Sequence, residues 1–252
     1  MLKLVTDTGT VFTRELRPLV RDPFSIVFGL VQPLVFLGLF GPLLAGMTGQ
    51  PTDQALQWFV PGVLVMLSLF GSSTTGANLL LEMQTGSHER MLVTPLSRSS
   101  LLIGRALKEI APTLAQAALI IVVTLPFGFR FSPLGALIGL LILSVFSIGL
   151  GALSHALALA VKERQGVFWL VQQTLLFPML ILAGMLLPID AGPAWLRVAA
   201  LANPLTYVVE AQRMLFAGTD LVSGPVVSGA AAALVMASVG LLVGSYAMRR
   251  AQ

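Results

Sequence analysis

Six stretches of the chain are almost free of charged residues, and each is about long enough to cross a membrane. They are residues 24–47, 58–81, 110–127, 133–161, 166–187 and 225–248. About 20 apolar residues cover the roughly 30 Å of hydrocarbon in a bilayer. Because a backbone in lipid must satisfy its own polar groups, each stretch is expected to be a helix. The pattern predicts an all-α membrane protein with six transmembrane helices, the third of them spanning 106–127.

The overall composition agrees with this class. Apolar residues make up 56% of the 252 residues and charged residues only 10%, whereas soluble domains are nearer a quarter charged. The net charge of +4 does not indicate a nucleic-acid binder, because the basic residues lie in short loops. Without cysteine, a disulfide or thiolate metal site is excluded. We expect no cleavable signal peptide and a single transmembrane domain over residues 1–252.

The basic residues predict an orientation. Six spans place both termini on one side of the membrane, and that side carries most of the Lys and Arg residues. They are Lys3, Arg14, Arg17, Arg21, Arg90, Arg98, Arg105, Lys108, Lys162, Arg164, Arg249 and Arg250. The other side has Arg130, Arg197 and Arg213. The positive-inside rule therefore places both termini in the cytoplasm.

Residues 2–22 are predicted to form an amphipathic helix on the cytoplasmic membrane surface. At about 100° per residue, its apolar residues fall on one arc and its basic residues largely on the other. The candidate interface residues are Arg14, Arg17 and Arg21. The alternative is a basic leader that only orients the first span.

The connection between the second and third spans is the longest cytoplasmic segment predicted. Gly86 can end the second span, Ser87 can cap a short helix, and Pro95 ends it because the residue before proline avoids the helical region. A force applied to a short helix over 86–95 would be transmitted to both spans. The alternative is a solvated loop whose basic residues serve only topology.

Two short helices are predicted between the fifth and sixth spans. One covers about residues 194–201, and the other is capped by Asn203, has Pro204 in its first turn and ends near Gly218. Neither is long enough to span the bilayer. Residues 193–218 are expected to dip into the outer leaflet and return, with an ordinary external loop as the alternative.

Residues three or four apart indicate further contacts. Glu210 and Arg213 lie one helical turn apart and can pair. Glycines at four-residue spacing allow close helix contact, although some such pairs arise by chance. They are Gly135 with Gly139 and Gly240 with Gly244.

The motifs of several enzyme classes are missing from the sequence. There is no GxxxxGK[ST] phosphate loop, no HExxH and no GxSxG. No carboxylate cluster accompanies His88 or His155, so no metal site is expected. This disfavours an intramembrane enzyme and means that the chain is not its own P-loop ATPase.

Polar residues at membrane depth are few and mostly uncharged. His155 is a candidate proton relay or substrate contact, with a neutral imidazole bonded to a neighbouring helix as the alternative. Asn78 is a candidate pathway residue; for it, as for Gln116, Gln172 and Gln173, the alternative is bonding between helices. Because no carboxylate lies near the middle of the spans, we expect the driving force to come from a separate motor subunit.

Three segments resemble the membrane subunits of ABC type-2 exporters. They are Arg21-Asp22-Pro23, GSHERMLVTPLSRSSLLIGRALKE at 86–109 and ANPLTYVVEAQRMLFAG at 202–218. The resemblance is strongest to the drug-resistance branch, similar to daunorubicin-exporter permeases. Ser87, His88 and Gln212 depart from the residues usual in the family.

The resemblance implies a multi-pass permease subunit of an ATP-driven exporter in the bacterial plasma membrane. It would move a hydrophobic or amphipathic substrate (a drug, lipid or lipid-linked glycan) out of the cytoplasm or inner leaflet. Two permease subunits, identical or related, would join two copies of a separate ABC ATPase subunit. ATP and Mg would bind to that partner and no cofactor to this chain, which contacts membrane lipid and no nucleic acid.

The resemblance also implies roles for particular residues. The ATPase-coupling helix would include Gly86, Ser87, His88, Glu89, Arg90, Met91, Leu92 and Val93. The re-entrant outer gate would include Asn203, Pro204, Tyr207, Glu210 and Arg213. The alternative function is a carrier or channel that works without an ATPase, coupled through His155 or a loop carboxylate.

Overall fold

The computed structural model describes residues 9, 13, 23–49, 51–85, 98–162, 164–186, 188–189, 192–218 and 220–250. The predicted interface helix, with Arg14, Arg17 and Arg21, lies outside these residues except for positions 9 and 13. The predicted coupling helix at 86–95, with all its candidate residues from Gly86 to Val93, also lies outside them.

The described residues form helices and no strand, and six of the helices are long and apolar enough to cross a membrane. They are α2 (Pro23–Thr48), α3 (Thr52–Gln84), α5 (Arg98–Thr124, followed by the 3-10 turn η1, Leu125–Phe127), α6 (Pro133–Ala160), α7 (Gln165–Leu182) and α10 (Gly224–Arg250). The short helices α8 (Ala194–Leu201) and α9 (Pro204–Ala217) lie between α7 and α10. The predicted all-α protein with six spans is confirmed.

Three helix ends differ from the sequence prediction. The helix α3 begins at Thr52 rather than 58, and α5 begins at Arg98 rather than 106. Polar first turns extend these helices beyond their apolar stretches, and Asp53 suits a helix N-terminus electrostatically. In contrast, α7 ends at Leu182 rather than 187 because Gly184 adopts a left-handed backbone, with φ of 65°. Apolar length therefore locates a span but not the ends of its helix.

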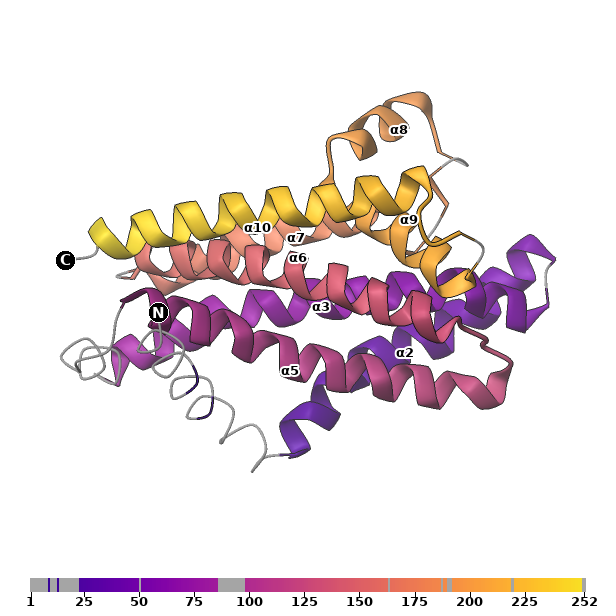
Figure 1. The fold of residues 1–252 in the computed structure, drawn as a ribbon, viewed down its shortest axis with the longest axis horizontal. Helices are drawn as coiled ribbons and strands as arrows, with labels where there is room; N and C mark the ends of the chain where they lie inside the picture. Colours follow the sequence, from indigo (N-terminus) through magenta and orange to yellow (C-terminus); the bar gives the residue numbers. More distant parts are fainter. Residues whose placement is uncertain are drawn as a thin grey trace.

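The long helices α3, α5, α6, α7 and α10 run roughly along one axis, with α3 and α6 at the centre, and α2 crosses them at an angle (Figure 1). In the apolar 18-residue stretches of α3 and α6, 78% and 56% of the residues are buried, against 22–28% in those of α2, α5, α7 and α10. The central pair is packed around fully buried side chains such as Phe59, Leu64, Leu143 and Phe146. The other four spans leave most of their surface for lipid or for another chain.

Glycines mark the closest helix contacts. A Cβ on Gly240 of α10 would overlap the backbone of Gly149 in α6, and a Cβ on Gly135 of α6 would overlap the carbonyl oxygen of Leu215 in α9. The second glycine of each predicted pair also lies at a close contact: Gly139 packs against Gln212, and Gly244 packs against Ala152. The prediction that both glycine pairs allow close helix contact is confirmed.

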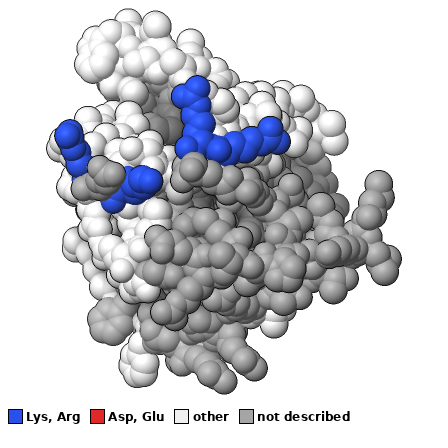
Figure 2. Space-filling view, turned by 90° about the vertical axis from the view of Figure 1, so that its left-hand side faces the viewer, with Lys and Arg blue, Asp and Glu red and all other residues white. Residues whose placement is uncertain are grey.

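The two ends of the bundle differ in charge. One end gathers the C-terminal ends of α3, α6 and α10 with the N-terminal ends of α5 and α7 (Figure 1). Figure 2 views this end, where Lys and Arg side chains gather and no described acidic side chain is visible. We call it the basic face; its described cations are Lys162, Arg164, Arg249 and Arg250. The opposite end holds the short helices α8 and α9.

Candidate functional site

A cavity of about 390 Å³ lies among α2, α3, α5 and α7. Among the residues that the structure describes, its lining includes these amide and hydroxyl side chains: Gln32, Ser73, Thr74, Asn78, Thr113, Gln116, Gln172 and Gln173. Leu67, Phe70, Trp169 and Leu176 add apolar and aromatic surface. We call this the polar cavity. It can accept a molecule that has both apolar area and hydrogen-bonding groups.

Part of this polar lining is exposed at membrane depth. Gln32, Asn78 and Gln173 each lie within a candidate span and are exposed. Thr74 is exposed as well, but its hydroxyl donates to the carbonyl oxygen of Gly71 at 2.7 Å. An amide or hydroxyl facing hydrocarbon without a partner costs several kcal/mol (about 4–8 by transfer to alkane). This face is therefore suited to water or to another protein chain rather than to lipid.

The two candidate pathway residues lie in different places. Asn78 lines the polar cavity, whereas His155 is buried on α6 and does not line it. The Nδ1 atom of His155 lies 3.0 Å from the carbonyl oxygen of Gly151 in the same helix. Gln116 and Gln173, for which bonding between helices was the favoured interpretation, line the cavity as well. Their common face on separate helices is a tertiary feature that sequence spacing does not reveal.

Gln172 joins three spans at the wall of the polar cavity. Its Nε2 donates to the carbonyl oxygen of Ser73 on α3 at 2.9 Å and to the hydroxyl of Ser154 on α6 at 3.0 Å. The Ser154 hydroxyl in turn donates to the Ser73 carbonyl at 3.0 Å and accepts from the Gly76 amide at 3.1 Å. The predicted bonding between helices is thus confirmed for Gln172.

A second set of hydroxyl bonds continues this contact along α3 and α6. The hydroxyls of Ser68 and Ser147 bond to each other, and Ser72 donates to the carbonyl oxygen of Ser147 at 3.3 Å. All three serines are buried. Because buried hydroxyls in lipid-facing proteins need partners, these bonds tie α3 and α6 together as one unit.

At the opposite end from the basic face, Asn203 connects α9 to α7. Its Oδ1 accepts from the Leu205 amide at 3.1 Å, which confirms the predicted helix cap. Its Nδ2 donates to the carbonyl oxygen of Met179 at 2.7 Å, near the end of α7. The local sequence predicts the helix cap, whereas the bond to α7 depends on the fold.

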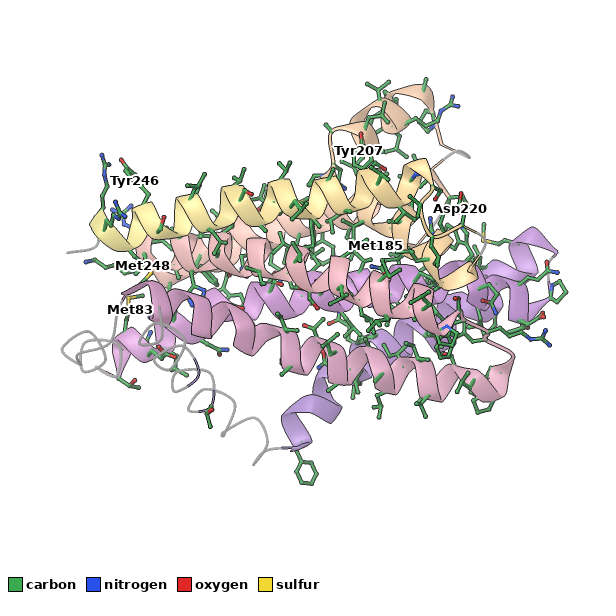
Figure 3. All side chains as sticks on the ribbon, viewed as in Figure 1. Met83, Met185, Tyr207, Asp220, Tyr246 and Met248 are labelled. Carbon is green, nitrogen blue, oxygen red and sulfur yellow. The ribbon has the colours of Figure 1, made fainter. Side chains whose placement is uncertain are left out.

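Thr206 and Tyr207 hold the first turn of α9 against its neighbours. Thr206 donates to the carbonyl oxygens of Ala200 at 2.9 Å and Leu182 at 3.2 Å. The hydroxyl of Tyr207, labelled in Figure 3, donates to the carbonyl oxygen of Leu201 at 2.8 Å. These acceptors are at the C-terminal ends of α8 and α7, where carbonyls lack partners within their helix.

Arg213 joins α9 to α3 and to the segment after α7. Its Nε donates to the carbonyl oxygen of Trp58 at 3.1 Å and its Nη2 to that of Gly184 at 2.7 Å. The guanidinium carbon lies 3.7 Å from the centre of the Trp58 ring. Among the described residues no ion pair joins Arg213 to Glu210, which is exposed, so the expected pairing is replaced by these contacts.

The charge of Arg213 persists despite burial. Arg213 lies on α9, outside the six spanning segments. Burial lowers its pKa to about 10, and the nearby charge of Glu210 acts in the opposite direction. The guanidinium therefore remains protonated at neutral pH.

Gln212, where this chain departs from the family's usual residue, is fully buried. Its Nε2 donates to the carbonyl oxygen of Gly139 at 2.6 Å. Its Oε1 has no partner among the described residues. The amide thus adds a bond between α9 and α6 at a contact that glycine already brings close.

The arrangement defines a multi-pass helical membrane protein whose spans surround a polar cavity. Residues 6–217 match the model of the ABC-2 type transporter family, and the chain belongs to this family. It is therefore a membrane permease subunit of an ABC transporter, a component distinct from the ATPases of such transporters.

Named relatives include drug-resistance permeases. The chain is 26% identical to the daunorubicin resistance ABC transporter permease protein DrrB1 of Streptomyces coeruleorubidus, over 85% of this chain and 76% of that protein. A Cyanophora paradoxa protein named as a transport permease, ycf38, is 32% identical over 83% of this chain and 76% of its own length. A Mycobacterium tuberculosis protein named as a doxorubicin resistance ABC transporter permease, DrrC, is 27% identical over 89% of this chain and 80% of its own length.

Proposed function

We propose that this chain is the permease of an ATP-driven exporter in the bacterial plasma membrane. The observation that carries the proposal is the polar cavity, whose amides and hydroxyls are exposed on one side of the spans. Two permease subunits that pair across this face would cover those groups and enclose a path between them. Exposed Asn78 and Gln173 would then contact substrate, water or the second subunit.

The substrate we propose is amphipathic or hydrophobic. Trp169 and Phe70 offer flat apolar surface beside the amides of Gln116 and Gln173. Such a lining suits a polycyclic drug or a lipid-like molecule better than a small ion, since none of the described side chains that line the cavity is charged. Two relatives are named for resistance to daunorubicin and doxorubicin, which makes anthracyclines the first substrates to test.

We also propose that force enters at the basic face. By the positive-inside rule this face is cytoplasmic, and the ends of α3 and α5 at Gln84 and Arg98 frame the segment that holds the expected coupling helix. Two copies of an ABC ATPase would press on Gly86–Val93, aided by the segment 162–164. The bonds through Gln172 and Ser147 make α3, α6 and α7 respond together.

At the other end, α8 and α9 would form a re-entrant outer gate. Asn203, Thr206 and Arg213 fasten α9 to the ends of α7 and α8 and to the start of α3. Motion of α7 relative to α3 would therefore pull directly on α9. This gives the gate a mechanical link to the walls of the polar cavity.

A secondary carrier remains the alternative function, and the cavity favours the exporter. An ion-coupled carrier needs a titratable group on the path, yet the described residues of the cavity lining include none and His155 lies outside it. Reconstitution with the partner ATPase tests the choice. We expect anthracycline uptake into inside-out vesicles to require ATP and both subunits. Uptake driven by an ion gradient with this chain alone would exclude the exporter.

A further inference from the structure

A second cavity, of about 260 Å³, lies at the end opposite the basic face, between α8, α9, the first part of α3 and the segment after α7. Its polar lining includes Arg197, Thr206, Glu210 and Arg213, with Trp58 at one wall. We call it the outer cavity. The proposed transport function does not assign a ligand to the charged residues that line this cavity.

Arg213 presents a fixed positive charge to the outer cavity. Its plane is held against the Trp58 ring at 3.7 Å, and its Nε and Nη2 donate to carbonyl oxygens. Carbonyls satisfy these donors without neutralising the cation. A guanidinium has five N–H groups, and Nη1 has no acceptor among the described residues. Arg213 is thus oriented but not paired with a carboxylate.

The described charges that line the outer cavity sum to a net positive charge. Arg197 is exposed, and its side chain makes no bond to a described residue. Glu210 is the one carboxylate in the described lining. Two guanidiniums against one carboxylate favour an anion, and guanidinium geometry matches phosphate through paired hydrogen bonds.

An apolar stripe on α8 lies beside the outer cavity. Trp195, Val198 and Leu201 are spaced three apart and are 68%, 67% and 64% exposed. Val198 and Leu201 also line the cavity. Such a stripe on a short helix suits the boundary between headgroups and acyl chains, where tryptophan is enriched. The anion that fits here carries apolar chains.

We propose that the outer cavity binds the phosphate of a membrane phospholipid headgroup. Arg213 and Arg197 contact the phosphate, and the acyl chains lie along the stripe of α8. Glu210 favours headgroups that carry a hydroxyl or ammonium donor beyond the phosphate. The site belongs to this chain alone, so binding does not depend on the transport function proposed above.

Lipid titration of the purified, delipidated permease in detergent, read by native mass spectrometry, tests the proposal. The probes are phosphatidylglycerol, diacylglycerol with the same acyl chains, and glycerol 3-phosphate. We expect saturable binding of phosphatidylglycerol, weakened about tenfold by Arg197→Gln because one charge-assisted contact is lost. Arg130→Gln is the matched control, since Arg130 is also exposed at this end but lies outside the outer cavity.

Three results would overturn the proposal. Equal binding of diacylglycerol would show that the chains alone are recognised, and equal binding of glycerol 3-phosphate would identify a soluble anion as the ligand. Equal affinities of the Arg197→Gln and Arg130→Gln variants for phosphatidylglycerol would place the lipid elsewhere. Because these measurements need neither ATP nor an ATPase, a failure of ATP-driven export leaves their outcome unchanged.

Discussion

The side chain of Gln172 on α7 is bonded to the carbonyl oxygen of Ser73 on α3, with a nitrogen–oxygen distance of 2.9 Å. The same nitrogen reaches the Ser154 hydroxyl on α6, so one amide holds three spans. Both bonds join α7 to the central pair, α3 and α6. This amide is therefore the most direct test of how α7 is held.

Replacing Gln172 with leucine should loosen α7 while leaving its apolar packing largely intact. Two hydrogen bonds between helices are lost, each worth about 0.6 kcal/mol in a membrane protein, so unfolding should become easier by about 1 kcal/mol. Thermal unfolding in detergent measures the change. Gln173→Leu is the control, because Gln173 is exposed and its side chain makes no hydrogen bond to a described residue. Equal losses in both variants would contradict the role of Gln172.

Gly240→Ala should separate α10 from α6. The new methyl group would overlap the backbone of Gly149, which cannot rotate away as a side chain can. Overpacking of this kind costs about 1–3 kcal/mol, and we expect a lower unfolding temperature and lower yield of folded protein. Gly38→Ala is the matched control, since no described residue lies within 4 Å of the added Cβ and alanine is the better helix former. An unchanged Gly240→Ala variant would contradict the close contact.

Sequence reasoning succeeded where the cause is local. Apolar length places the six spans, and the order Asn203–Pro204 is enough to start α9 because a cap needs only its own helix. The spacing of Gly240 and Gly244 marks a contact face, but the partner Gly149 could not be chosen from it. A spacing pattern identifies one helix face of a contact but does not identify the partner helix.

Sequence reasoning failed where segments distant in the chain bind the same side chain. Arg213 lies three residues from Glu210, which makes an ion pair the local expectation. The fold instead offers the carbonyl oxygens of Trp58 and Gly184, which are 155 and 29 residues away in sequence. The grouping of amides around the polar cavity could not be predicted for a related reason. Four helices must pack together before these side chains share a face.

Two substitutions at Asn203 separate its two bonds. Asn203→Ser keeps a cap acceptor for the Leu205 amide but loses the donor to Met179, whereas Asn203→Ala loses both. The cap alone is worth about 1 kcal/mol, so thermal unfolding should rank the wild-type chain first, Asn203→Ser second and Asn203→Ala last. Equal stability of the two variants would mean that the cap contributes nothing beyond the bond to α7.

Asn78 and His155 should differ in their effect on transport. Asn78→Leu removes a polar group from the cavity lining, so the apparent affinity for an anthracycline should change several-fold with little change in stability. His155→Ala should leave most ATP-driven transport intact, since His155 lies outside the cavity. Uptake into vesicles containing both subunits measures both variants. Complete loss of transport in folded His155→Ala protein would restore the proton-relay hypothesis.

Glu89→Arg should uncouple ATP hydrolysis from transport. Glu89 lies outside the described residues, between α3 and α5, in the segment where the family resemblance places the coupling helix. Reversing a charge at a docking surface opposes the match with the ATPase and costs several kcal/mol when it meets a like charge. We expect transport to fall more than tenfold while the permease keeps its unfolding temperature. Asp53→Arg makes the same charge change at the exposed start of α3, on the opposite end of the bundle, and should leave transport near the wild-type level. Loss of transport in Asp53→Arg but not in Glu89→Arg would put the ATPase at the wrong end of this bundle and reverse the proposed orientation.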